Sequence, residues 1–202
     1  MGYKPTQYKT TVPMQDITRY LTWANCKRLI QHTECLRDKV FFSLAVSTGR
    51  RIGELINIRI RDINIEEGTI LWFIEKKRKE YKVVKHVPKM AWEPMLDYIM
   101  TLENPAPEAY LFQSTYTDRP LTTQRWRQIL HKLSERYNIL TEGQQRPRIH
   151  DLRHSCGVQI YNKTNDIRVV QRVLEHKDYN MSAQYARIST KDTEHKLEGV
   201  FE

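Results

Sequence analysis

One interruption of a helical pattern constrains the fold of this chain more than any other feature. Apolar residues recur at helical spacing over most of the sequence, but residues 69–74 (TILWFI) form a short apolar run rich in strand formers. Residues 81–87 (YKVVKHV) are a second strand candidate, closed by Pro88, and a basic run separates the two. The sequence therefore predicts a hairpin within a helical chain. The fold class is α+β, mainly α with a small antiparallel β-sheet.

Helices are expected on both sides of the hairpin. Pro94 falls near the first turn of one of them, where proline is tolerated. Thr122 or Thr123 is the expected cap of another. The helical segments are predicted at residues 15–31, 36–47, 51–60, 91–102, 121–137, 150–163, 166–174 and 180–188.

Composition excludes several classes of protein. The chain is 40% hydrophobic and 28% charged, which is typical of a folded globular domain and not of a disordered chain. No run reaches the roughly 18 apolar residues of a membrane helix, and the N-terminus lacks the apolar core of a secretion signal. Cys26, Cys35 and Cys156 are scattered, so neither a zinc knuckle nor a disulfide framework is indicated. We expect a reducing, intracellular setting.

Positive charge is concentrated in two stretches. The net charge is +9, and residues 76–89 carry seven Lys or Arg against the single acid Glu80. A second basic run covers residues 125–136. Clustered positive charge indicates binding to a phosphate backbone, although a solvated lysine-rich hairpin remains an alternative. The residues expected to contact DNA are Lys77, Arg78, Lys79, Lys82, Arg125 and Arg127.

Three separated segments carry residues suited to chemistry on a phosphate. The first is residues 48–55 (TGRRIGEL), and the second is residues 150–154 (HDLRH). The third is residues 174–176 (LEH), followed by Tyr185 nine residues after His176. The His-x-x-Arg spacing of the second segment places both side chains on one helix face. Each segment alone also fits an ordinary surface or core role.

Together, the three segments resemble the tyrosine recombinase family, which includes lambda-integrase-like enzymes. That family's pattern is TGxRxxEL, a hairpin lysine, HxxR, and then LGH with a tyrosine about nine residues later. The resemblance covers roughly residues 15–190 and implies the catalytic-domain fold of the family. Residues 1–14 are then expected to be a flexible arm and residues 191–202 a C-terminal tail. Family members usually have an N-terminal helical domain, so this chain is either an excised domain or a minimal protein.

The resemblance implies a role for each matching residue. Tyr185 would attack a DNA phosphodiester and form a 3′-phosphotyrosyl intermediate. Arg51 and Arg153 would clamp the phosphate oxygens with planar, paired donors. His150 would act as base or proton acceptor, and His176 would hydrogen-bond the phosphate.

A lysine on the hairpin is expected to protonate the leaving 5′-oxygen as general acid. The family spacing after Gly68 places this lysine at Lys76, with Lys77 one residue further on. Adjacent strand residues point to opposite faces, so Lys76 and Lys77 cannot both reach the phosphate from a regular strand. Lys76 is the preferred assignment, and Lys77 stays open.

Two residues depart from the family pattern. Glu175 replaces the usual glycine before the histidine, and its carboxylate could repel DNA unless it points away or pairs with a cation such as Lys177. Arg50 replaces an apolar residue and competes with Arg51 for the first arginine role. The Arg-x-x-Glu spacing to Glu54 favours Arg51.

The predicted activity requires no cofactor, metal ion or ATP. A two-metal nuclease needs clustered carboxylates, whereas Glu66 and Glu67 are expected in a turn and Asp151 is expected to serve structure. No phosphate-binding glycine loop is present in the sequence.

The expected function is site-specific DNA recombination or integration, as in mobile elements. The expected partners are double-stranded DNA and further copies of the chain, in a tetramer on synapsed DNA, without a membrane. The expected location is the cytoplasm, at the nucleoid, in a prokaryote or a viral element. Alternatives are type IB topoisomerase-like relaxation, an inactive DNA-binding protein of the same fold, or an unrelated basic nucleic-acid-binding module.

Overall fold

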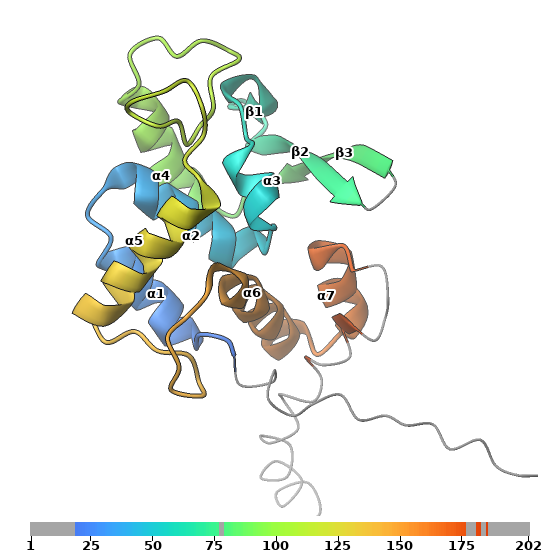
Figure 1. The fold of residues 1–202 in the computed structure, drawn as a ribbon. Coiled ribbons are helices and arrows are strands. Elements are labelled where there is room, and N and C mark those ends of the chain that lie inside the picture. Colours follow the sequence, from blue (N-terminus) through green and yellow to red (C-terminus); the bar gives the residue numbers. More distant parts are fainter. Residues whose placement is uncertain (1–18, 77–78, 177–180, 183–184, 186–202) are drawn as a thin grey trace, which may run out of the picture.

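The computed structural model describes residues 19–76, 79–176, 181, 182 and 185 of the 202-residue chain (Figure 1). At residues 75, 76, 79 and 80 only the backbone is described. The predicted arm at residues 1–14 and the predicted tail at residues 191–202 therefore lie outside the described residues.

The described residues form a mainly helical domain with one small antiparallel sheet, which confirms the predicted fold class. Figure 1 shows the hairpin β2–β3 projecting away from the helices. The elements in chain order are α1 (Trp23–Gln31), α2 (Leu36–Thr48), α3 (Ile52–Ile56), a 3₁₀ turn (Ile60–Asp62), β1 (Ile63–Asn64), β2 (Thr69–Lys76), β3 (Lys79–His86), α4 (Lys89–Met100), α5 (Thr123–Arg136), α6 (Ile149–Thr164) and α7 (Ile167–Leu174).

Helix α2 lies at the centre of the core and packs against α1, α4 and α6. Its residues from Val40 to Val46 are all buried, so it has no solvent face in that stretch. The Phe41 ring stacks on the Trp126 ring of α5, with centroids 3.6 Å apart. Phe112 meets both rings edge-on. This aromatic cluster joins α2 to α5.

The sheet has the strand order β1-β2-β3, and all its pairings are antiparallel. Buried Ile70, Trp72 and Ile74 alternate with partly exposed Leu71 and Phe73, as expected for a sheet with one covered face. The predicted hairpin is confirmed, whereas β1 is too short to have a recognisable sequence pattern.

Two predicted helices differ from the observed ones. The helix expected at residues 15–31 begins only at Trp23, because Thr22 caps it by accepting a hydrogen bond from the backbone N–H of Asn25. The Leu21 N–H instead donates to Ser155 Oγ on α6, at 2.8 Å. The helix expected at residues 51–60 is also too long, because α3 ends at Ile56 and a 3₁₀ turn follows.

The remaining helix predictions need smaller changes. Helix α4 begins at Lys89, so Pro94 lies inside the helix and not near its first turn as predicted. Thr122, not Thr123, caps α5 by accepting from the Arg125 N–H at 3.1 Å. Of the segment expected at residues 180–188, only residues 181, 182 and 185 are described, and they are helical.

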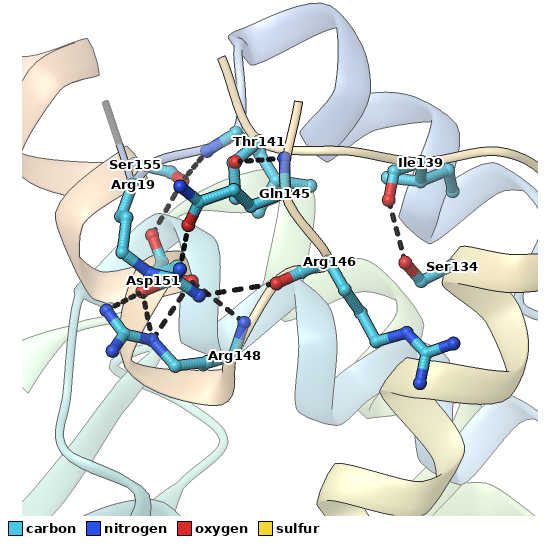
Figure 2. A network of polar contacts seen from close by, with 10 residues as sticks. Arg19, Ser134, Ile139, Thr141, Gln145, Arg146, Arg148, Asp151 and Ser155 are labelled. Atoms are coloured by element: carbon cyan, nitrogen blue, oxygen red, sulfur yellow. Dashed lines mark hydrogen bonds and ion pairs between the residues drawn. The ribbon is translucent and has the colours of Figure 1, made fainter. Parts of the chain in front are cut away.

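Buried Asp151 anchors the first turn of α6 (Figure 2). Its carboxylate accepts from the Arg148 backbone N–H at 2.8 Å and from the Arg148 guanidinium at 3.0 Å. The Arg19 guanidinium, from the segment before α1, lies 3.4 Å from the same carboxylate. Ser155 donates to the Asp151 carbonyl at 2.8 Å. Asp151 therefore serves structure, as its place in the sequence indicated.

We expect Asp151→Ala to lower the free energy of unfolding by about 3 kcal/mol, because it leaves two arginines and a backbone N–H without their buried partner. Urea denaturation measures this change. Glu93→Ala is the control, since its ion pair with Lys89 is exposed and is expected to contribute little. A loss no larger than that of the control would contradict the anchoring role.

Candidate active site

The first arginine segment forms a tight turn between α2 and α3. Gly49 ends α2 with φ 61°, and a Cβ there would lie 2.3 Å from Leu174 Cδ2, so only glycine fits. Arg51 caps α3: Glu54 accepts from the Arg51 N–H at 3.0 Å and pairs with its guanidinium at 3.1 Å. The Arg-x-x-Glu spacing is therefore a helix cap. The Arg51 side chain remains 39% exposed and is accessible to a ligand.

Arg153, on α6, is buried and joins two turns of the site. One terminal nitrogen donates to the Gly49 carbonyl, and the other donates to the Leu174 carbonyl at the end of α7. Burial, and then the neighbouring charge of Arg51, lower the pKa of Arg153 to about 10. The guanidinium therefore stays charged at neutral pH.

The two predicted histidines, His150 and His176, lie in the field of the same arginines. A further histidine, His154, is one turn after His150 on α6, with ring centroids 4.7 Å apart. Burial and the charge of Arg153 lower the pKa of His150. Burial, followed by the charges of Arg153 and Arg51, lowers the pKa of His176 to about 4. Both imidazoles are therefore neutral near pH 7.

Tyr185 is buried beside these histidines. Its hydroxyl lies 3.1 Å from His154 Nδ1, and its ring is parallel to the His176 ring with centroids 6.1 Å apart. The ring also lies against Gly157, where an added Cβ would be 2.5 Å from Tyr185 Cζ. Among the described residues, the structure thus brings together five of the predicted site residues: Arg51, His150, Arg153, His176 and Tyr185.

Two members of the site were not singled out from the sequence. His154 contacts the Tyr185 hydroxyl, and its spacing of four residues from His150 is the signal that could have identified it. Ser182 lies 2.8 Å from His176 Nδ1 and orients that ring. Its only sequence signal is its position between His176 and Tyr185.

The two departures from the family pattern contact each other. Two nitrogens of Arg50 lie 3.1 and 3.2 Å from Glu175 Oε1, and the Arg50 guanidinium lies 5.2 Å from the Trp72 ring centre. Arg50 is therefore occupied, which leaves Arg51 as the accessible arginine. Burial raises the pKa of Glu175, but the Tyr81 hydroxyl and Arg50 outweigh it and lower that pKa overall. The suggested partner Lys177 lies outside the described residues.

The basic residues expected to contact DNA are only partly described. Lys76 is the last residue of β2, where its backbone pairs with that of Lys79 in β3. Lys77 and Arg78 lie outside the described residues. Lys82 is exposed on β3, with its ammonium 5.0 Å from the Phe73 ring centre. The side chains of Arg125 and Arg127 are exposed on α5.

The described residues contain neither a metal-binding cluster nor a helix able to span a membrane. No group of three His, Cys, Asp or Glu side chains within them is arranged to hold a metal ion. None of the helices in that part of the chain combines the length and apolar character that crossing a bilayer requires.

Comparison with known proteins gives consistent matches. Residues 19–192 match the phage integrase family. A tyrosine recombinase from Agathobacter rectalis is 25% identical over 191 residues, which cover 92% of this chain and 60% of that protein. The tyrosine recombinase XerA from Pyrococcus horikoshii is 24% identical over 186 residues, covering 91% of this chain and 62% of XerA. The chain thus spans about three fifths of the length of these two relatives.

The fold is also found in solved recombinase structures. The post-cleavage complex of the XerH site-specific recombinase with a palindromic difH substrate superposes with a TM-score of 0.69. The identity is 21%, and the match covers 92% of this chain and 54% of XerH. The superposition shows the shared fold. The match over residues 19–192 shows that the chain belongs to the phage integrase family, the tyrosine recombinases.

Proposed function

We propose that this domain cleaves and rejoins DNA strands at a specific site through a 3′-phosphotyrosyl intermediate formed by Tyr185. The observation that carries the proposal is the convergence of Tyr185 and His176 with Arg51 and Arg153. Two fixed cations beside a tyrosine suit a reaction in which negative charge increases on a phosphate. Their placement by helix caps and backbone carbonyls provides this charge before DNA arrives.

The proposed reaction begins with attack of the Tyr185 oxygen on phosphorus. A tyrosine–phosphate ester forms, and the bond from phosphorus to the 5′-oxygen breaks. The tyrosine proton passes to His150, and a proton from Lys76 goes to the leaving 5′-oxygen. Because Tyr185 is 1% exposed in the free chain, its hydroxyl has to move toward the phosphate when DNA binds. Attack by the 5′-hydroxyl of a partner strand reverses these steps without ATP.

Arg51 and Arg153 would bind the non-bridging phosphate oxygens. Arg153 already donates two of its five N–H groups to carbonyls, which fixes the plane of its guanidinium. His176, held by Ser182, would donate a hydrogen bond to the same phosphate. The choice of Lys76 is supported by strand alternation, which places position 76 on the same face of β2 as buried Trp72 and Ile74.

The proposed partners are double-stranded DNA and further copies of the chain. The basic hairpin and the exposed arginines of α5 provide charge for the DNA backbone. Exchange between two duplexes breaks four strands, and each protomer provides one Tyr185, so a tetramer on synapsed DNA matches the chemistry. The matched relatives come from a bacterium and an archaeon, which supports action at the nucleoid of a prokaryote or in a viral element.

The proposal can be tested without knowing the target sequence. The protein is incubated with a pool of nicked duplexes that are randomised around the nick, and covalent complexes are isolated after denaturation. Sequencing of the trapped DNA identifies the site, and mass spectrometry identifies the linked peptide. Relaxation of a supercoiled plasmid without strand exchange would instead favour a topoisomerase-like activity.

Tyr185→Phe is expected to bind the trapped DNA with unchanged affinity but to form no covalent complex, because it lacks the attacking oxygen. Gel electrophoresis under denaturing conditions measures the adduct. Tyr161→Phe is the matched control, since Tyr161 packs on the same small apolar cluster as Tyr185. An adduct that persists in Tyr185→Phe would move the nucleophile to another residue.

Arg51→Ala is expected to slow single-turnover cleavage by about 100- to 1,000-fold, because one donor to the phosphate is lost at the transition state. Arg61→Ala removes an exposed arginine outside the site and controls for the loss of charge. A rate for Arg51→Ala that matches the rate for Arg61→Ala would show that Arg51 does not hold the reacting phosphate.

The lowered pKa of His176 predicts a pH dependence of stability. The unfolded imidazole binds a proton near pH 6.5 and the folded one near pH 4, so the unfolded chain holds more protons between these values. The contribution of His176 to the free energy of unfolding is therefore fully present above about pH 6.5 and is lost as the pH drops toward 4. Urea denaturation of the wild type and of His176→Gln isolates this contribution. An equal loss of stability in both proteins would contradict the assignment.

A further inference from the structure

The contact between Arg50 and Glu175 extends to the β-hairpin. Glu175 Oε1 accepts from two nitrogens of Arg50, at 3.1 and 3.2 Å, and Oε2 accepts from the Tyr81 hydroxyl. Tyr81 lies on β3 and pairs with Ile74 of β2, two residues before Lys76. A single carboxylate thus binds side chains from the α2–α3 turn and from the hairpin.

Each participant lies close in sequence to a residue of the proposed reaction. Arg50 directly precedes Arg51, and Glu175 directly precedes His176. Trp72 of β2 lies under the Arg50 guanidinium, which adds a second contact between the sheet and this pair. The carboxylate therefore connects three segments that carry proposed catalytic groups.

The backbone of Glu175 adopts a strained conformation. Glu175 ends α7 with φ 53°, in the left-handed region where glycine is favoured. Its side chain is 11% exposed and that of Arg50 is 4% exposed, so both charges are largely removed from water. Glycine at position 175 would remove the backbone strain together with these contacts. A strained residue that persists beside a site points to a role for its side chain.

We infer that Glu175 is a positioning residue, which holds the β-hairpin that carries Lys76 in place relative to the turns that carry Arg51 and His176. This inference rests on the proposed function for its catalytic consequence, but the structural link exists without DNA. Tyr81 links Glu175 Oε2 to β3, and Arg50 binds the other carboxylate oxygen, Oε1. A glycine at position 175 would have no side chain to make this link.

Tyr81→Phe tests the link most directly, because it removes one hydroxyl and leaves the Arg50–Glu175 pair intact. Hydrogen exchange of the free protein, followed by mass spectrometry, is expected to show about 3- to 10-fold faster exchange in peptides from β2 and β3. Glu175→Gln is expected to accelerate the same peptides. Tyr110→Phe is the matched control, since its hydroxyl accepts from Arg59 at 3.0 Å, away from these contacts. Unchanged exchange in both Tyr81→Phe and Glu175→Gln would overturn the inference.

The catalytic consequence is tested with two versions of the DNA trapped above. One has the ordinary 5′-oxygen at the scissile phosphate, and the other has a 5′-sulfur, which leaves without a proton. Tyr81→Phe is expected to slow cleavage of the oxygen substrate about 10-fold or more and to cleave the sulfur substrate within about 3-fold of the wild-type rate. An equal loss on both substrates, or no loss, would overturn the positioning role.

These measurements separate the two proposals. If the wild-type protein forms no adduct on any DNA, the proposed function fails, and the exchange experiment alone decides whether Glu175 holds the hairpin. If the wild type forms an adduct and Tyr81→Phe shows neither faster exchange nor selective rescue by sulfur, only the inference about Glu175 fails.

Discussion

The proposed active site depends on the two hydrogen bonds that the buried Arg153 guanidinium donates to the carbonyls of Gly49 and Leu174. A buried cation is tolerated only where its N–H groups are satisfied, so these carbonyls both stabilise Arg153 and fix its plane. The same bonds hold the end of α2 against the end of α7. Gly49 allows this approach, because any Cβ there would collide with Leu174. Asp151, two residues earlier on α6, anchors the helix that presents Arg153.

The distribution of charge around Arg153 prepares the site for an anion. Glu54 holds Arg51 through its backbone and guanidinium but leaves that side chain 39% exposed. Glu175 takes up the charge of Arg50 instead. Because Glu175 compensates the charge of Arg50, the positive charge that a ligand can reach is that of Arg51. The same field, added to burial, keeps His176 neutral near pH 7. A phosphate bound there would favour protonation of that imidazole.

Much of the fold could be predicted from local pattern. The switch from helical to strand spacing identified the antiparallel hairpin of β2 and β3. The errors occurred where tertiary contacts replace helical hydrogen bonds. Leu21 donates its N–H to Ser155 on α6, so the first helix starts later than its apolar spacing suggests. β1 is two residues long and exists because β2 provides its partner.

For the site, the sequence alone determined which residue types are present and in what order: the arginines, histidines and tyrosine of three spaced segments. Their spacing also determined local geometry, since Arg51 and Glu54 form a helix cap and His150 and Arg153 share a helix. Only the tertiary structure shows that Arg50 is paired while Arg51 stays accessible, because the partner of Arg50 is Glu175, 125 residues away. It likewise placed His154 against the Tyr185 hydroxyl. Such pairings depend on how α2, α6 and α7 pack, which no local sequence pattern encodes.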